Sequence, residues 1–194
     1  MKPRVLSLIV ASAAVRRLAQ KTPFVGMVLL AVGLLATPLL MPSAGNAQDA
    51  DARVAKSMAA LKDQTAKLGA PKIDGIDAVG GRDAPALYFG STKMNNNFTV
   101  VDDVAQEGGQ GMTATLFVKS GDDYIRIATN VRTRTGLGRA IGTILAGSAL
   151  ESIKASKAYY GKVQILGTPH ISGYELIKDA AGATVGVYFV GYKK

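Results

Sequence analysis

Arg126 is the residue whose type and position most suggest binding chemistry. It lies in the middle of the apolar run 123–131, and a charge in such a setting needs an anion or several hydrogen-bond acceptors. A guanidinium binds a carboxylate through two parallel hydrogen bonds. Arg126 is therefore a candidate clamp for a ligand carboxylate. The alternative is a strand residue that faces solvent and pairs with an Asp or Glu on a neighbouring strand.

Arg139 is a second candidate, because it lies in the glycine-containing segment 136–142. Glycines let backbone amides approach a ligand closely. Arg132 and Arg134 precede this segment, so a solvated basic loop is an equally good interpretation.

Tyr160, Tyr174 and Lys178 complete the set of candidate ligand-binding residues. Tyrosines supply ring faces and hydroxyls that orient a small molecule, although a tyrosine on a strand can equally be part of the core or of the sheet surface. Lys178 follows the strand that contains Tyr174, and its alternative is a solvated side chain.

The sequence lacks the residues that catalysis or metal binding would need. It has no Cys and one His, His170, which excludes thiol nucleophiles, Cys-ligated metals and His-rich sites. Ser172 has no nucleophile-elbow glycines around it, and the Asp pairs at 102–103 and 122–123 suit turns. His170 is interpreted as a surface or capping residue. We therefore expect no enzyme activity, no metal and no cofactor.

The positive charge of the chain is concentrated at its beginning. The formal net charge is +9 over 194 residues, and residues 1–47 contribute five Lys and Arg and no acid. The remaining chain has 18 basic and 14 acidic side chains, a net charge of +4. A nucleic-acid partner, which needs clustered basic residues, is therefore not predicted.

Residues 1–47 have the three parts of an export signal. A basic region up to Lys21 precedes the uncharged stretch 24–41, and small residues lead up to Ala47. We expect cleavage after Ala47, or retention of residues 24–41 as an anchor. In either case, residues 48–194 would form one domain that is periplasmic or secreted.

One long helix and several short strands are predicted for that domain. Residues 49–68 contain no Gly or Pro, and their apolar side chains recur at helical spacing. A shorter helix is predicted over 149–159. Short runs rich in β-branched and aromatic residues predict strands over 86–89, 98–101, 113–119, 123–131, 162–166, 171–177 and 184–190.

Hairpin turns are expected at 120–123 and 178–182, where Gly and Asp separate neighbouring runs. Strand alternation should place Tyr124, Arg126 and Ala128 on one face and Ile125 and Ile127 on the other. The fold class is therefore α+β, with a long N-terminal helix on one face of a five- or six-stranded antiparallel sheet.

The order of motifs in the second half resembles a known family. The hairpin 115–131 is followed by 138–143, 159–161, 165–167, 173–179 and 185–191. This series is similar to single Cache domains, the PAS-like extracellular sensors related to the fused double-Cache domains of bacterial chemoreceptors. The resemblance runs from about Ala86 to the end and implies a PAS-like sheet whose concave face holds a small carboxylate or amine.

The predicted function is a non-enzymatic binding module that acts with a membrane receptor partner. Because the sequence ends soon after the last predicted strand, we expect no signalling module of its own. The alternative is a structural or interaction protein of the cell envelope that keeps the fold without a ligand pocket. Converging side chains around an open cavity would favour the first function, and a cavity filled by side chains would favour the second.

Overall fold

The computed structural model describes residues 45–194, with side chains from residue 52 onward. The predicted signal over 1–47 lies outside these residues, apart from 45–47, which begin the first helix. The possible anchor at 24–41 lies outside them as well. No helix in the described range is long and apolar enough to span a membrane.

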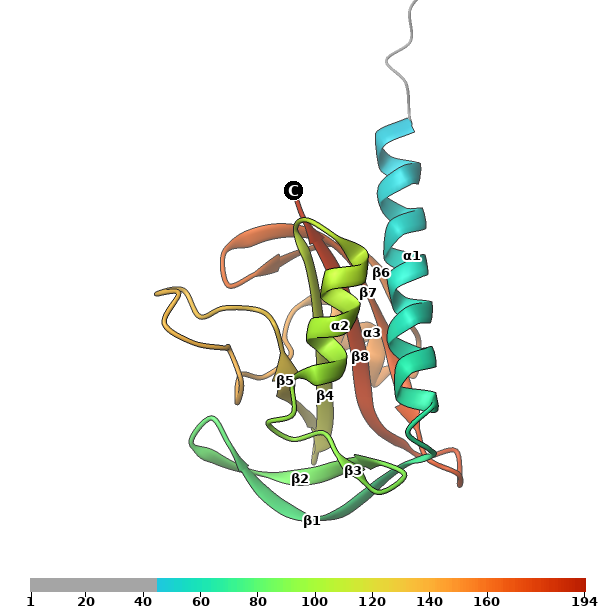
Figure 1. The fold of residues 1–194 in the computed structure, drawn as a ribbon, viewed down its shortest axis with the longest axis vertical. Helices are drawn as coiled ribbons and strands as arrows, with labels where there is room; N and C mark the ends of the chain where they lie inside the picture. Colours follow the sequence, from blue (N-terminus) through green and yellow to red (C-terminus); the bar gives the residue numbers. More distant parts are fainter. Residues whose placement is uncertain (1–44) are drawn as a thin grey trace, which may run out of the picture. The chain divides into compact units, whose positions relative to one another are not determined.

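Two antiparallel sheets and three helices make up the described domain, which confirms the predicted α+β class. The larger sheet has five strands in the order β5-β4-β8-β7-β6, and the smaller has three in the order β1-β2-β3. Figure 1 shows α1 and α2 side by side against the larger sheet, with the smaller sheet beyond their ends. The elements are α1 (Gly45–Ala66), β1 (Pro71–Val79), β2 (Arg82–Phe89), β3 (Thr92–Lys93), α2 (Thr99–Gly108), β4 (Met112–Ser120), β5 (Asp123–Thr129), α3 (Ser148–Lys154), β6 (Tyr159–Ile165), β7 (Thr168–Lys178) and β8 (Thr184–Lys193).

Helix α1 packs its predicted stripe on the larger sheet. Val54, Met58 and Leu61 are buried there, and burial of side chains of this size stabilises the fold by about 1.5–3 kcal/mol each. The buried Thr65 hydroxyl lies 3.1 Å from the hydroxyl of Tyr188 on β8. Polar groups inside the interface are thus hydrogen-bonded, which fixes the register of the helix on the strand.

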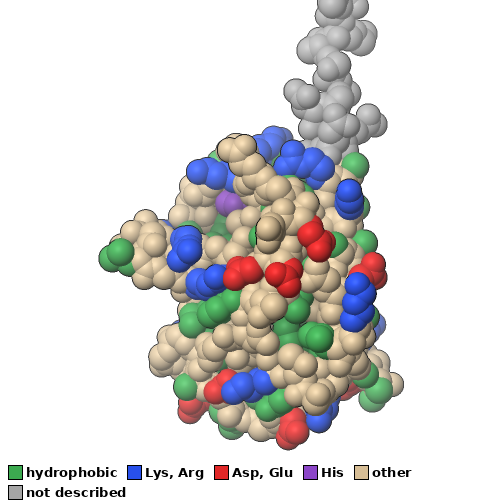
Figure 2. Space-filling view, in the orientation of Figure 1, with side chains coloured by type: hydrophobic (Ala, Val, Ile, Leu, Met, Phe, Trp, Pro, Cys, Tyr) green, Lys and Arg blue, Asp and Glu red, His purple; other side chains and the backbone are tan. Residues whose placement is uncertain are grey.

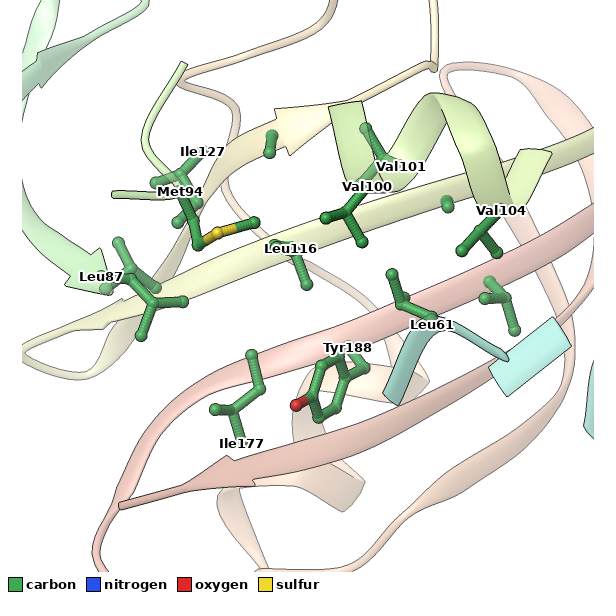
Figure 3. Packing of buried hydrophobic residues seen from close by; sticks show 14 of the residues in the cluster. Leu61, Leu87, Met94, Val100, Val101, Val104, Leu116, Ile127, Ile177 and Tyr188 are labelled. Carbon is green, nitrogen blue, oxygen red and sulfur yellow. The ribbon is translucent and has the colours of Figure 1, made fainter. Parts of the chain in front are cut away.

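The core on the α1 side of the larger sheet contains residues from the two helices α1 and α2 and from both sheets. Figure 3 shows Leu61 of α1 close to Tyr188 of β8, with the valines of α2 over Leu116 of β4. Leu87 of β2 belongs to the same cluster. The smaller sheet is therefore fastened to the larger one through this core.

The opposite face of the larger sheet carries a second, smaller core. Phe117 of β4, Tyr174 of β7 and Phe189 of β8 are buried on this face, and Ile153 of α3 packs against them. The segment 132–147, between β5 and α3, also contributes buried residues. This face is incompletely covered, and the pocket described below lies here.

The predicted strand over 98–101 is wrong, because Phe98 is the N-cap of α2 and residues 99–101 form its first turn. Two adjacent valines favoured a strand. However, Val100, Val101 and Val104 form the buried face of a helix, which has the spacing of one helix side. Tertiary packing of this face therefore outweighed the intrinsic strand preference.

Other boundaries also differ from the predictions. The helix predicted over 149–159 is confirmed as α3 but ends at Lys154, and Tyr159 already begins β6. The predicted strand over 86–89 belongs to the smaller sheet. Strands β1 and β3 were not predicted: β1 is mostly exposed, and β3 has two residues. Both predicted hairpins are confirmed, as β4–β5 and β7–β8.

The predicted alternation along β5 holds only as far as Ile127. Leu116 pairs with Ala128 and Phe117 with Arg126, so Ile127 is the extra residue of a β-bulge. Ala128 therefore joins the core on the α1 side together with Ile125 and Ile127, rather than lying on the face of Arg126. A bulge cannot be seen in a two-residue period, because it breaks that period.

The turn after α1 lies close to the β2–β3 turn, which predicts a steric effect at Gly90. Gly90 and Gly121 both have φ of 59°, where any other residue is strained by about 1–2 kcal/mol. A Cβ on Gly90 would overlap the carbonyl oxygen of Leu68, whereas a Cβ on Gly121 would meet nothing within 4 Å. Chemical denaturation should show Gly90→Ala losing at least about 1 kcal/mol more stability than the control Gly121→Ala. Equal losses would contradict this close approach.

Candidate functional site

Arg126 is positioned by strand pairing on both sides of β5. On the inner side it lies opposite Phe117 of β4. On the outer side, the Arg126 amide donates to the carbonyl oxygen of Thr143 (2.9 Å), and the Gly142 amide donates to the Arg126 carbonyl oxygen (2.8 Å). The Leu145 amide donates to the carbonyl oxygen of Tyr124 (2.9 Å). This segment covers the edge of the sheet and brings Thr143 beside the guanidinium.

The guanidinium of Arg126 is buried and has few protein acceptors. The side chain donates from Nη1 to the Thr143 hydroxyl (2.7 Å), and its Cζ lies 5.1 Å from the centre of the Phe117 ring. Nε is buried without a hydrogen-bond partner, and no described Asp or Glu forms an ion pair with the residue. Desolvation lowers the pKa of Arg126 to about 10, so the side chain stays charged at neutral pH.

A pocket of about 830 Å³ opens beside Arg126. Its size lies within the range of small-molecule sites in proteins. The walls come from both edges of the larger sheet: the segment after β5 lies on one side, and β6 with the following turn lies on the other. The lining residues are Arg126, Arg134, 143–148, 162–167, Pro169, His170, Tyr174 and Lys194.

The lining of this pocket carries positive charge. Arg126, Arg134, Lys162 and Lys194 belong to it, and none of the described residues that line it is Asp or Glu. On the surface, Figure 2 shows Lys and Arg side chains gathered at the end of the domain where β8 finishes. A ligand in the pocket therefore meets an electrostatic environment that favours anions.

Tyr174 faces the same pocket from β7. The residue is 2% exposed, and its ring packs 4.8 Å from the centre of Phe189 and 6.1 Å from that of Tyr159. Burial raises the pKa of the Tyr174 hydroxyl, while the nearby Arg126 charge lowers it by a smaller amount. The hydroxyl is thus neutral and can donate a hydrogen bond to an acceptor held by Arg126.

His170 lies on the same face of β7 as Tyr174, four residues earlier, and lines the pocket. Its Nδ1 lies 2.9 Å from the carbonyl oxygen of Thr168. A carbonyl only accepts, so Nδ1 carries the proton and Nε2 has a free lone pair. Burial lowers the pKa of His170; the hydrogen bond to Thr168 opposes this shift, and the charge of Lys193 adds to it by a smaller amount. The interpretation of His170 as a surface residue is wrong, since it is 5% exposed.

Arg139 lies outside the pocket, where it joins the loop after β5 to α2. Its two Nη atoms donate to the two carboxylate oxygens of Asp102 at 2.7 and 2.8 Å, and Nη1 also donates to the Thr129 carbonyl oxygen at 2.8 Å. The guanidinium lies 4.3 Å from the centre of the Phe98 ring. The Arg139 guanidinium therefore has hydrogen-bond acceptors and a counter-charge within the protein, and few of its N–H groups are left to bind a ligand.

Tyr160 and Lys178 also lie away from the pocket. Tyr160 is on the α1 side of the sheet, where its hydroxyl donates to Glu175, and Glu175 forms an ion pair with Lys62 of α1 (2.7 Å). Lys178 is exposed at the end of β7. Of the five residues predicted as ligand-binding, the structure thus brings only Arg126 and Tyr174 to the pocket.

Several pocket residues were missed by sequence reasoning. A signal existed for His170, because residues four apart on a strand share a face and Tyr174 was already a candidate. For Thr143, Lys162 and Lys194 no local signal existed. They reach the pocket through the pairing and order of the strands, which a single sequence does not display.

Comparison with known families gives one match. The family described as the Cache 3/Cache 2 fusion domain matches residues 44–194, and this range includes all the elements described above. The match confirms the resemblance noted from the sequence motifs. No curated protein matches the chain.

The contacts of Arg139 predict that it stabilises the fold and contributes little to binding. Arg139→Met removes the charge-assisted hydrogen bonds to Asp102 and leaves that carboxylate without its partner. Since both side chains are partly exposed, we expect a loss of about 1–2 kcal/mol in the free energy of unfolding, measured by urea denaturation. Asp102→Asn should give a similar loss. A variant as stable as the wild type would contradict this role.

The environment of His170 predicts a pH dependence of stability. A base whose pKa is lowered by folding takes up its proton more readily when unfolded, so its contribution is complete above about pH 6.5 and is lost as the pH falls. Between pH 7.5 and 5.5, the wild type should therefore lose more stability than His170→Gln. Denaturation at the two pH values measures the difference. Equal losses in the two proteins would show that the folded state does not lower this pKa.

Proposed function

Because the chain belongs to the Cache 3/Cache 2 fusion domain family, we propose that its described domain binds a small carboxylate beside Arg126. Cache domains are extracellular or periplasmic sensor domains, and in general they bind small molecules without catalysing reactions. The domain is thus a sensor domain by family. The carboxylate and the residues that hold it are inferred from the chemistry of the pocket.

The unpaired charge of Arg126 is the observation that carries this proposal. Burying a charge without a partner is unfavourable by several kcal/mol, and among the described residues the side chain of Arg126 donates to one acceptor, the Thr143 hydroxyl. A ligand carboxylate would accept from the remaining guanidinium N–H groups, with the Tyr174 hydroxyl as a further donor. The arrangement therefore suits a carboxylate ligand.

An amine, the other ligand class expected from the sequence, has no counter-charge in this pocket. The described lining residues include four Lys and Arg and no acid, so an ammonium group would meet only repulsion. The same pocket argues against the alternative of an envelope protein without a ligand site. In such a protein, we expect side chains to fill a space of about 830 Å³.

The remaining parts of the proposal concern location and partner. We propose that residues 1–47 direct export, with 24–41 as an anchor if they are retained, and that the domain acts in the periplasm with a membrane receptor. The basic and apolar pattern of the first 47 residues supports export. A receptor partner is consistent with the sensor role of the family.

A thermal-shift screen of the full chain tests the carboxylate proposal. Small mono- and dicarboxylates, amines and amino acids are compared at pH 7.5. A ligand at 100 times its Kd stabilises the native state by about 2.7 kcal/mol, which corresponds to a rise of about 5–10 °C in Tm for a domain of this size. We expect one or more acids, and no simple amine, to give such a rise.

Substitution of Arg126 separates binding from folding. Without ligand, Arg126→Met should have an unchanged or higher Tm, because an apolar side chain of similar length replaces an unpaired buried charge. It should lose the shift given by acids, whereas the control Lys178→Met keeps it. An acid that stabilises Arg126→Met as much as the wild type, or a screen in which only amines respond, would overturn the proposal.

A further inference from the structure

A second pocket adjoins the first on the same side of the sheet. It has a volume of about 580 Å³ and lies between the beginning of β4, the end of β5 and the turn that joins β6 to β7. Arg134, Ile165, Leu166 and His170 line both pockets. The two spaces therefore lie next to each other, and these four residues form the wall that they share.

The second pocket is also lined by cations. Arg132, Arg134 and Lys193 belong to its lining, and no Asp or Glu does among the described residues. The four ion pairs formed within the described domain involve other Lys and Arg residues. The side chains at the shared wall are therefore available to an anionic group.

His170 lies at the same wall and can gain a proton when its surroundings change. With Nδ1 bonded to the Thr168 carbonyl, Nε2 is left as an acceptor. The charged groups near it are Lys193 from β8, Arg134 from the loop after β5 and Lys194, all positive. These cations disfavour a proton on Nε2, and an anion placed among them would favour it.

We propose that Arg134, His170 and Lys193 form a second anion-binding subsite, so that the ligand is an elongated dianion with an anionic group at each end. One end would bind Arg126 as in the proposed function, on which this inference rests. The other end would lie at the wall between the two pockets. The apolar side chains of Ile165 and Leu166 line both spaces and suit the hydrocarbon part of such a molecule.

The test uses pairs of probes that differ by one charge at equal length. Succinate, glutarate and adipate are each compared with their half-amides, succinamate, glutaramate and adipamate, by calorimetry on the full chain at constant ionic strength. For the length that fits, we expect the dicarboxylate to bind at least 10-fold more tightly than its half-amide. 3-Phosphonopropionate serves as a further probe, since tighter binding than succinate would identify a phosphate-like second group.

Variants at the shared wall test whether its side chains cause the preference for the dicarboxylate. Lys193→Gln and Arg134→Gln change exposed side chains and should reduce the ratio of dicarboxylate to half-amide affinity at least fivefold. Lys178→Gln, outside both pockets, should leave the ratio unchanged. Titration in two buffers of different ionisation enthalpy should show proton uptake with the dicarboxylate, and His170→Gln should abolish that uptake.

The outcomes distinguish this inference from the proposed function. If an acid binds in an Arg126-dependent way but the dianions bind no more tightly than their half-amides, the second subsite is overturned and the carboxylate site stands. A preference for dianions that survives in both wall variants also overturns it. If no acid binds the wild type, both proposals are overturned.

Discussion

The buried positive charge of Arg126 is the constraint around which the pocket is arranged. The sheet on one side and the segment 142–145 on the other keep most of this side chain from water, yet no described Asp or Glu forms an ion pair with it. A fold gains nothing in stability from such a charge. Its position is explained if the missing acceptor comes from outside, because a site held ready for an anion has little reorganisation left to undergo on binding.

One face of the larger sheet carries most of the core that stabilises the fold, and the other face carries the candidate binding pocket. On the α1 side, helices and the smaller sheet bury a continuous core, and the buried hydroxyls of Ser57 and Thr65 are paired with those of Tyr192 and Tyr188. On the other face, α3 and the loop after β5 cover only part of the sheet. The continuous core on the α1 side supplies the stability that the open pocket and the unpaired charge do not provide.

Local patterns were sufficient to predict most elements of this fold from the sequence. The stripe of α1, the two hairpins and the strands of the larger sheet all follow from periodicity and turn residues within short windows. Two of the failures occurred where a contact distant in sequence decided the structure. Val100 and Val101 form a helix because the core lies beside them, and Ile127 bulges because the partner strand imposes its register.

Contacts distant in sequence also decide which arginine can bind a ligand. Arg126 and Arg139 are both candidate anion-binding residues from their local sequence, although the two Asp residues near in sequence lie beside Arg126 and not Arg139. Asp102, 37 residues before Arg139, supplies a carboxylate to one of them, while the segment that covers Arg126 brings Thr143 and no acid. An arginine is therefore available to a ligand only when the fold leaves it without an acid in space. That property depends on chain topology, and residue type alone does not encode it.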